Sequence, residues 1–521
     1  LAGAEIRGEK AEGIFEKRYG YDPVTGNSAM PVPKDPGNGE GFKYSDLVSY
    51  ANAMDQLSGQ EIEENRFASF YGALDYSLFD RYVLNVSFRT DGSNNFGSDE
   101  QFNPTWSAGA VWHVSEETFM EVVRPVLSRL SLRVATGYTG NINKTVKPNL
   151  MMKYYKNFRI SDDENYRMGY INNAPNPKLR WEKTRDVKVA LDFGLWKDRI
   201  NGIVEAYWRK SKDCVTSEYV PVTTGFFNQS YNTSVLQNNG VEFSLSVAVL
   251  KSKDYNLSVS ANVAWNQNKL KKYNSPNTSL ALDKYVGYPM GAVFSGKYEG
   301  IDPETGMYKF KLRPDAVTNK DGYLREPNNY YYYLGTSVAP FTGGFNLNFS
   351  YKNIGLSVGG SYSVKAKMVD NIESPAGYEL LSGSKLESIP TPHNDLYRNH
   401  LNVKREVRNR WTPENRTGVK YPRLIDAYGK KLGLDLTNPT LTTITRGALL
   451  EDISYLRINT IALSYSLPQR VLERINFSSA ALNLTLNNFF TITKYSGIDP
   501  EVPGATYPVS RSVTIGLNVG F

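Results

Sequence analysis

The last ten residues, SVTIGLNVGF (residues 512–521), carry the pattern that decides the fold. Apolar residues alternate strictly with polar or small ones, and the apolar set is Val513, Ile515, Leu517, Val519 and Phe521. Successive side chains of a β-strand point to opposite faces, so a period of two predicts a strand with one apolar face. A soluble sheet edge and a membrane-barrel wall both give this pattern, and the rest of the chain must separate them.

The same alternation returns along the whole chain, in about fourteen segments. The clearest lie at 187–195, 241–249, 255–266, 345–351 and 482–487, and the others at 66–78, 81–91, 102–114, 129–140, 199–210, 291–300, 354–366, 454–467 and 510–521. Many runs are longer than the five or six residues of a typical globular strand and match the roughly 9–11 of a tilted membrane strand. We therefore expect lipid to face the apolar residues Leu257, Val259, Leu347, Leu482 and Leu484.

Short and long connections also alternate. Short turns are expected near 78–81, 195–199, 251–254 and 351–353, and long loops notably at 141–180, 211–240, 301–338 and 367–453. Outer-membrane barrels have short turns on the periplasmic side and long loops outside. In lipid every backbone polar group needs a partner, which a closed sheet provides. The pattern predicts an all-β, transmembrane antiparallel barrel, with 1–521 forming part of one barrel domain; a soluble β-sandwich adhesin is the alternative.

Composition excludes several classes of protein. The 521 residues have a mean hydropathy of −0.45, as expected when half of each strand faces water, and 13% are aromatic. The one cysteine, Cys214, excludes a disulfide framework and a cysteine-based zinc site. A net charge of +7, from 60 basic and 53 acidic residues, is too weak and too evenly spread to predict nucleic-acid binding.

The sequence predicts neither catalysis nor a cofactor. Its paired carboxylates lie in expected loops, and it contains no nucleophile-elbow, zinc-protease or phosphate-loop motif. Two of the three histidines, His393 and His400, fall in one long loop, where a metal site is less favoured than plain solvation. We therefore expect no catalytic residues and no bound metal, and a barrel enzyme is disfavoured.

Aromatic residues in the long loops are the candidate substrate contacts. They are Phe96, Trp181, Tyr330, Tyr331, Tyr332 and Trp411. Aromatic rings beside amides and arginines suit sugar rings or extended peptides. For any single residue, packing between loops or contact with a partner is the favoured explanation, and substrate contact is the alternative.

Several longer motifs carry a family resemblance. Residues 65–97 contain a DRY turn and an RTDGSNNFG loop, and LSLRVATGYTGN (130–141), NPKLRWEKT (176–184), GIDPETG (300–306) and YLRINTIALSYSLP (455–468) follow in order. Together they resemble the barrel of SusC/RagA-type TonB-dependent outer-membrane transporters, over nearly the whole chain.

The resemblance implies a fold and a function. Such barrels have about 22 strands around a plug, so the chain is expected to hold about fourteen of them, with the plug and amino-terminal extension upstream of Leu1. The implied function is TonB-dependent import of oligosaccharides or oligopeptides across the outer membrane, together with a SusD-like surface lipoprotein. TonB would act through the plug, and the barrel-assembly machinery would read Phe521 as its signal. A passive porin is the alternative transporter.

Overall fold

The computed structural model describes most of the chain. The described residues are 1–16, 25, 27, 58–144, 146–155, 159–161, 164–165, 168–226, 228–273, 285–304, 306, 308–311, 313–314, 331–369, 408–419, 447, 450–503 and 507–521.

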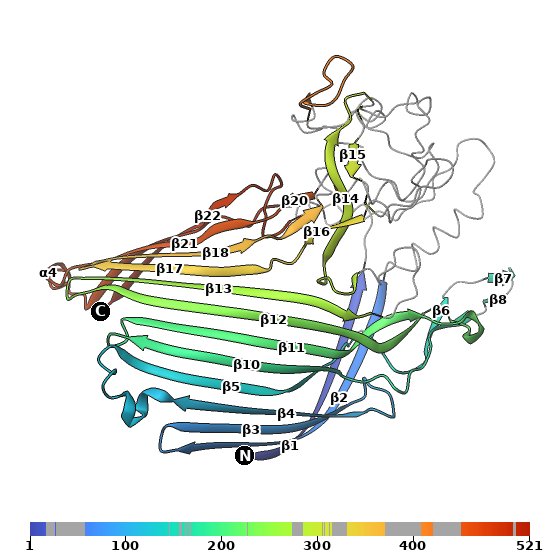
Figure 1. The fold of residues 1–521 in the computed structure, drawn as a ribbon, viewed down its shortest axis with the longest axis horizontal. Coiled ribbons are helices and arrows are strands. Elements are labelled where there is room, and N and C mark those ends of the chain that lie inside the picture. The colour runs from blue at the N-terminus through green and yellow to red at the C-terminus, as the bar shows by residue number, and fades with distance from the viewer. Residues whose placement is uncertain are drawn as a thin grey trace.

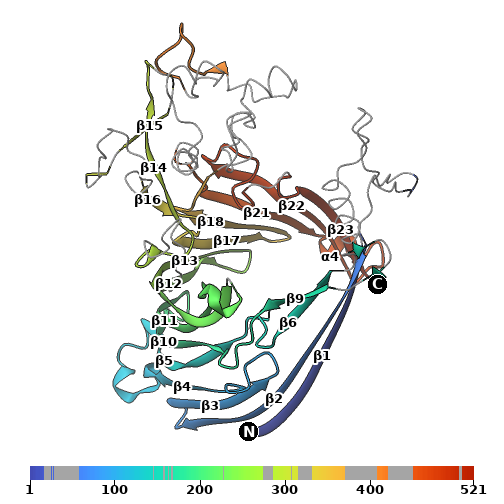
Figure 2. The same cartoon turned by 90° about the vertical axis from the view of Figure 1, so that its right-hand side faces the viewer.

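One curved antiparallel sheet of fourteen strands dominates the molecule (Figure 1). Each strand pairs with the next in this order: β1 (Ala2–Glu16), β2 (Ser58–Leu78), β3 (Tyr82–Ser93), β4 (Phe102–His113), β5 (Leu127–Asn141), β10 (Glu182–Leu195), β11 (Ile200–Tyr219), β12 (Asn228–Lys251), β13 (Tyr255–Lys272), β17 (Phe341–Tyr351), β18 (Ile354–Val364), β21 (Tyr455–Ser466), β22 (Ser479–Thr493) and β23 (Ser512–Gly520). Seen along the strands, the sheet bends into a crescent (Figure 2). Among the described residues β1 and β23 form its two edges. A single sheet confirms the predicted barrel-type architecture and excludes the two-sheet sandwich.

The predicted strand count is right, but one member differs. Segment 291–300 forms β14 (Ala292–Ile301), which belongs to a small sheet with β15 (Tyr308–Lys311) and β16 (Tyr331–Thr336). The main sheet bypasses this segment because β13 pairs directly with β17, from Tyr255↔Tyr351 to Trp265↔Phe341. The fourteenth place is taken by β1, whose charged sequence AGAEIRGEKAEGIFE lacks a clean apolar alternation.

The connections divide the sheet into two ends. The short-turn end holds the β2–β3, β10–β11, β12–β13 and β17–β18 turns, two single 3₁₀ turns (Val114–Glu116, Thr118–Met120) and helix α4 (Gln469–Leu472). Phe79 and Asp80 adopt φ of 54° and 55° in the β2–β3 turn, the left-handed conformation that tight hairpins need. No helix in the described part of the chain is long and apolar enough to cross a bilayer.

The opposite, long-loop end carries all the small sheets. Besides β14–β16 these are β19 (Lys367–Val369) with β20 (Leu450–Asp452), β6 (Met151–Tyr155) with β9 (Met168–Asn173), and β7 (Arg159–Ser161) with β8 (Glu164–Asn165). The expected long loop at 211–240 is mostly strand instead, because β11 runs to Tyr219 and β12 begins at Asn228. Polar cross-strand pairs, such as Thr216 with Thr233 at 3.0 Å between hydroxyls, extend this hairpin beyond its apolar part.

Within the described residues, no second layer covers the apolar face of the sheet. Large apolar side chains stay exposed on that face, including Ile515 at 73% and Leu517 at 66%. The described buried cluster, Ala366 with Ile453 and Tyr495, lies at the long-loop end, away from the middle of the sheet. A sheet of this size with an uncovered apolar face requires another apolar medium to contact it.

Candidate functional site: the inner wall of the sheet

Strand register assigns every residue of the sheet to one of two faces, because directly paired residues share a face. In one row across six strands the pairing runs Leu257, Phe349, Leu356, Leu463, Leu484, Ile515. The next row runs Ser258, Asn348, Ser357, Ala462, Thr485, Thr514. The apolar row and its neighbours form the outward face, and the polar row forms the inward face.

The register places all five residues predicted to face lipid, Leu257, Val259, Leu347, Leu482 and Leu484, on the outward face. Lipid contact itself remains a prediction.

The three central paired rows on the inward face of β13, β17, β18, β21, β22 and β23 carry no charge; Arg457 lies in a row nearer the long-loop end, paired with Ser361. We call these three rows the neutral wall, and they contain only Asn, Ser, Thr, Gly and Ala. One is the row that begins at Ser258. The second is Asn256, Ser350, Gly355, Ser464, Asn483 and Gly516, and the third is Ser260, Asn346, Gly359, Thr460, Asn487 and Ser512.

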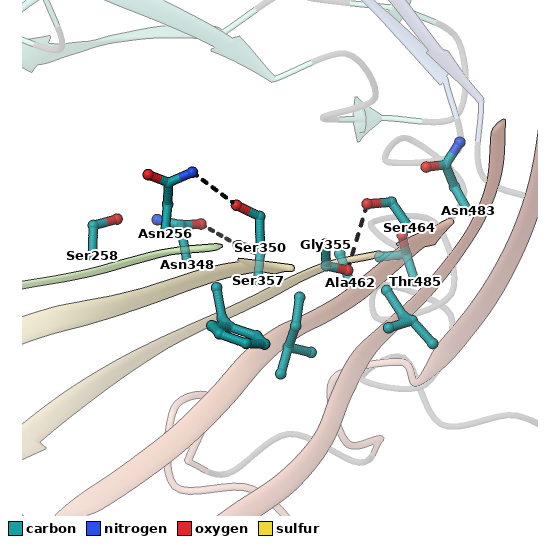
Figure 3. A pocket seen from close by; sticks show the side chains of 13 residues that line it. Asn256, Ser258, Asn348, Ser350, Gly355, Ser357, Ala462, Ser464, Asn483 and Thr485 are labelled. Atoms are coloured by element: carbon teal, nitrogen blue, oxygen red, sulfur yellow. Dashed lines mark hydrogen bonds between the residues drawn. The ribbon is translucent and has the colours of Figure 1, made fainter. Parts of the chain in front are cut away.

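Two hollows lie on this inward face. The first, of about 450 Å³, lies over β13 to β22. Figure 3 shows its labelled side chains pointing from their strands to the same side. Ser357 donates to the Asn348 amide oxygen at 2.8 Å, and Asn256 donates to the Ser350 hydroxyl at 3.5 Å. The second hollow, of about 350 Å³, adjoins it and includes Arg129 at its edge. Both surfaces offer hydrogen-bond donors and acceptors.

The inward face of β3 to β12 is charged, and several of its charges form ion pairs. Arg133 contacts Asp192 at 2.6 Å, and Arg209 contacts Asp186 at 2.9 Å.

Farther along, the Arg89 guanidinium lies 2.7 Å from Asp91 and 3.2 Å from Glu5, and it also donates to the Ser69 hydroxyl at 2.9 Å. The inward face of the sheet therefore has a neutral part and a part with ion pairs.

Nothing in the described inner wall has the geometry of a catalytic site. The nearest approach is His113, whose Nδ1 lies 3.0 Å from the Ser131 hydroxyl. No described carboxylate is hydrogen-bonded to this histidine, so the third member of a triad is missing from this part of the chain. No described group of three or more His, Cys, Asp and Glu side chains could hold a metal ion.

Two predicted substrate contacts meet each other instead of open space. Phe96 stacks on Trp181 with ring centroids 4.7 Å apart, and less than a tenth of either side chain is exposed. They join the β3–β4 loop to the segment before β10, where the Gly97 N–H donates to the Leu179 carbonyl at 2.9 Å. In this structure the pair builds the rim of the long-loop end.

The remaining candidates are scattered over the long-loop end. Trp411 is 7% exposed and donates its indole N–H to the Pro303 carbonyl at 3.0 Å. Tyr332 is half-buried in β16, Tyr331 is described only through its backbone, and Tyr330 lies outside the described residues. The structure thus brings together Phe96 and Trp181, and substrate contact by any of the six residues stays a prediction.

A better-exposed aromatic cluster lies just beside the predicted tyrosine run. The Tyr288 ring lies 4.9 Å from those of both Phe294 and Tyr333, and Tyr285 packs edge-on against Phe294 at 4.7 Å. A hollow of about 290 Å³ lies between Tyr288, Tyr333 and the outer end of β13. Tyr333 directly follows the predicted run, whereas Tyr288 is distant in sequence and lies just before β14, which pairs with β16.

A buried ion pair fixes the last long loop. Arg457 of β21 contacts Asp499 at 2.5 Å and Glu501 at 3.0 Å, and the Arg457 and Asp499 side chains are 3% and 6% exposed. Burial alone raises the pKa of the Asp499 carboxyl. Backbone N–H groups of Glu501 and Val509 and the Arg457 guanidinium more than offset it, so this pKa lies below its ordinary value.

Comparison with known proteins decides the family. The family model "TonB dependent receptor-like, beta-barrel" matches residues 15–382. The chain belongs to this family. Strand-by-strand pairing, the uncovered apolar face and the polar inner wall all agree with a barrel wall of this family in the outer membrane.

Individual relatives within this family give a more detailed comparison. The chain is 27% identical over 488 residues to the TonB-dependent receptor SusC of Bacteroides thetaiotaomicron, covering 88% of this chain and 44% of that protein. It is 26% identical over 498 residues to the TonB-dependent receptor P26 of Formosa agariphila, covering 88% and 46%. A solved structure of the RagAB peptide transporter superposes with a TM-score of 0.71 at 26% identity, covering 89% of this chain and 49% of that one. The chain spans about half the length of the relatives it matches.

Proposed function

We propose that this TonB-dependent receptor barrel takes part in active import of oligosaccharides or oligopeptides across the outer membrane, with a SusD-like surface lipoprotein as partner. The observation that carries the proposal is the joint match to SusC and to the RagAB peptide transporter over nearly nine-tenths of the chain. In this proposal TonB supplies the driving force through a plug, and the chain acts as a transporter wall without enzymatic activity.

The fourteen strands are then part of a larger closed barrel. Within the described residues β1 and β23 each have one unpaired side, and backbone groups facing lipid need partners. Lipid contacts Leu257, Val259, Leu347, Leu482 and Leu484. Phe521 is the assembly signal; its side chain is 91% exposed at the short-turn end and meets the Phe477 ring at 5.2 Å.

The neutral wall supports passage of polar cargo. Transport requires contacts that are weak and repeated, so that a solute can both enter and leave. Amide and hydroxyl groups without net charge supply such contacts for sugar hydroxyls and for peptide backbones alike. The members of each ion pair on the other side neutralise each other.

The decisive experiment is affinity purification of the full-length protein from the native outer membrane. Mass spectrometry would identify co-purifying proteins and bound small molecules. The proposal expects a surface lipoprotein in stoichiometric amount and an oligosaccharide or oligopeptide that accumulates only when TonB is functional. Uptake of that compound at an unchanged rate in a strain lacking TonB would refute active import and favour a passive pore.

A further inference from the structure

Five cations gather on the outward face of the sheet near its long-loop end. They are Lys183 and Arg185 of β10, Lys210 and Lys212 of β11, and Lys269 of β13, and we call them the outer cation patch. Register places them side by side: Arg185 pairs directly with Lys210, and Lys183 pairs directly with Lys212. Gln237 of β12 connects Lys210 to Lys269 in the same row.

The patch has no acidic partner within the described chain. None of the five cations forms an ion pair there, and Arg185, Lys210 and Lys212 are exposed. Like charges directly opposite each other destabilise a sheet. The inner faces of the same strands behave differently, because Lys188 pairs with Glu205 at 3.4 Å and Arg209 with Asp186. The contrast within two strands indicates a counter-charge supplied from outside the chain.

Neighbouring aromatic residues place the patch at a membrane surface. On the outward face Trp208 lies two residues before Lys210, and Trp265 lies four residues before Lys269. Tyr138 pairs directly with Arg185 and its ring meets Trp106 at 5.9 Å. Rings of this kind sit at the headgroup level of a bilayer. Below them along the strands come Val189, Val204 and Val263, and above them come the cations.

The patch belongs to the outer leaflet, since the long loops of such barrels lie outside the cell. The neighbouring strands β17 and β18 end on the same face with Phe341 and Val364, and the Lys365 ammonium that follows lies 5.1 Å from the centre of the Phe341 ring. The directly paired cations are those of β10 and β11.

We propose that the outer cation patch binds the phosphate groups of an outer-leaflet glycolipid headgroup. Lysine and arginine form strong charge-assisted hydrogen bonds with phosphate oxygens. Gln237, Gln267 and Asn239 lie on the same outward rows and can bond the sugar hydroxyls. The patch contains two adjacent pairs of cations, Arg185 with Lys210 and Lys183 with Lys212. A headgroup with two or more phosphates matches these two pairs better than a headgroup with a single phosphate does.

The test compares two matched charge-removal variants of the full-length protein. One is Lys183→Gln/Arg185→Gln/Lys210→Gln/Lys212→Gln, in the patch. The control is Lys197→Gln/Lys251→Gln/Lys253→Gln/Lys352→Gln, which removes four cations at the short-turn end. Native mass spectrometry measures the affinity of each for bisphosphorylated lipid A, dephosphorylated lipid A and phosphatidylglycerol, with inorganic phosphate as competitor.

We expect wild type and control to bind bisphosphorylated lipid A equally. Each cation near a charged membrane surface changes the binding constant by roughly fivefold, so the patch variant should bind at least about 100-fold more weakly. Equal binding by the patch variant would overturn the proposal. So would equal retention of dephosphorylated lipid A or phosphatidylglycerol, or full displacement by millimolar phosphate. If the fourfold variant does not fold, salt titration of wild-type binding decides, and salt-insensitive retention refutes the site.

Discussion

Replacing Leu484 with arginine tests the assignment of the two faces directly. Leu484 lies in the middle of β22, paired with Leu463 on one side and Ile515 on the other. Its neighbour Thr485 lies in the neutral wall, paired with Ala462 and Thr514. The two positions are adjacent in sequence and equal in depth, so each is the ideal control for the other.

The magnitude follows from the depth of the residue. Leu484 is five residues from Ser479, where β22 begins at the short-turn end, which is about 17 Å along the strand at 3.3 Å per residue. A strand tilt of roughly 40° reduces this to about 13 Å, half of the roughly 25 Å apolar band of a barrel. Arginine at such a midplane position costs about 2–4 kcal/mol, whereas Thr485→Arg in a wet lumen costs about 0–1 kcal/mol.

The assay is reversible unfolding by denaturant in lipid vesicles, with the heat-modifiable gel shift as an independent measure of folded barrel. We expect Leu484→Arg to lower the free energy of unfolding by the amount above and Thr485→Arg to leave it nearly unchanged. Equal losses for the two variants would refute the face assignment, and a larger loss for Thr485→Arg would reverse it.

Three further predictions concern the ends of the sheet. Deleting Phe521 should lower the amount of folded barrel in the outer membrane several-fold, as measured by the gel shift, and unchanged levels would contradict its role as assembly signal. Asp499→Asn should make the segment around it sensitive to limited proteolysis, since unpairing one member of a buried ion pair costs about 3–5 kcal/mol. Because the folded pKa of Asp499 is lowered, its stabilisation is complete above the unfolded value near 4 and is lost as the pH falls through the folded one. Wild-type protection should therefore be flat from pH 7 to about 4 and fall below that; loss already at pH 6 would contradict this. Gly97→Ala would put a Cβ 1.8 Å from the Pro177 carbonyl oxygen and should lower stability by about 1–3 kcal/mol, while Gly8→Ala, with nothing within 4 Å, should be neutral.

Local alternation made most of the sheet predictable. The residues of segments such as 255–266 and 482–487 are enough to predict a strand and its two faces. This is because the period of two in a pleated strand does not depend on its pairing partner. The strand at 2–16 lacks that signal, and its place in the sheet depends on pairing with β2. The segment at 291–300 has the signal but pairs elsewhere, since alternation does not specify a partner.

Site residues were less predictable because they depend on contacts between distant segments. The sequence showed Phe96 and Trp181 as loop aromatics, and folding stacks them against each other across 85 residues of chain. The Tyr288–Tyr333 cluster and the Arg457–Asp499 pair likewise join segments that are distant in the sequence.

The sequence by itself determined an all-β chain with one apolar and one polar face per strand, since side-chain direction in a strand is a local property. Only the tertiary structure decided which strands are neighbours. It therefore also decided that the uncharged amides lie together on one part of the inner wall and the ion pairs on the other, and that Arg185 lies opposite Lys210. Register is a long-range choice among many strands of similar pattern, and it is settled by the summed pairing of backbone and side chains across the whole sheet.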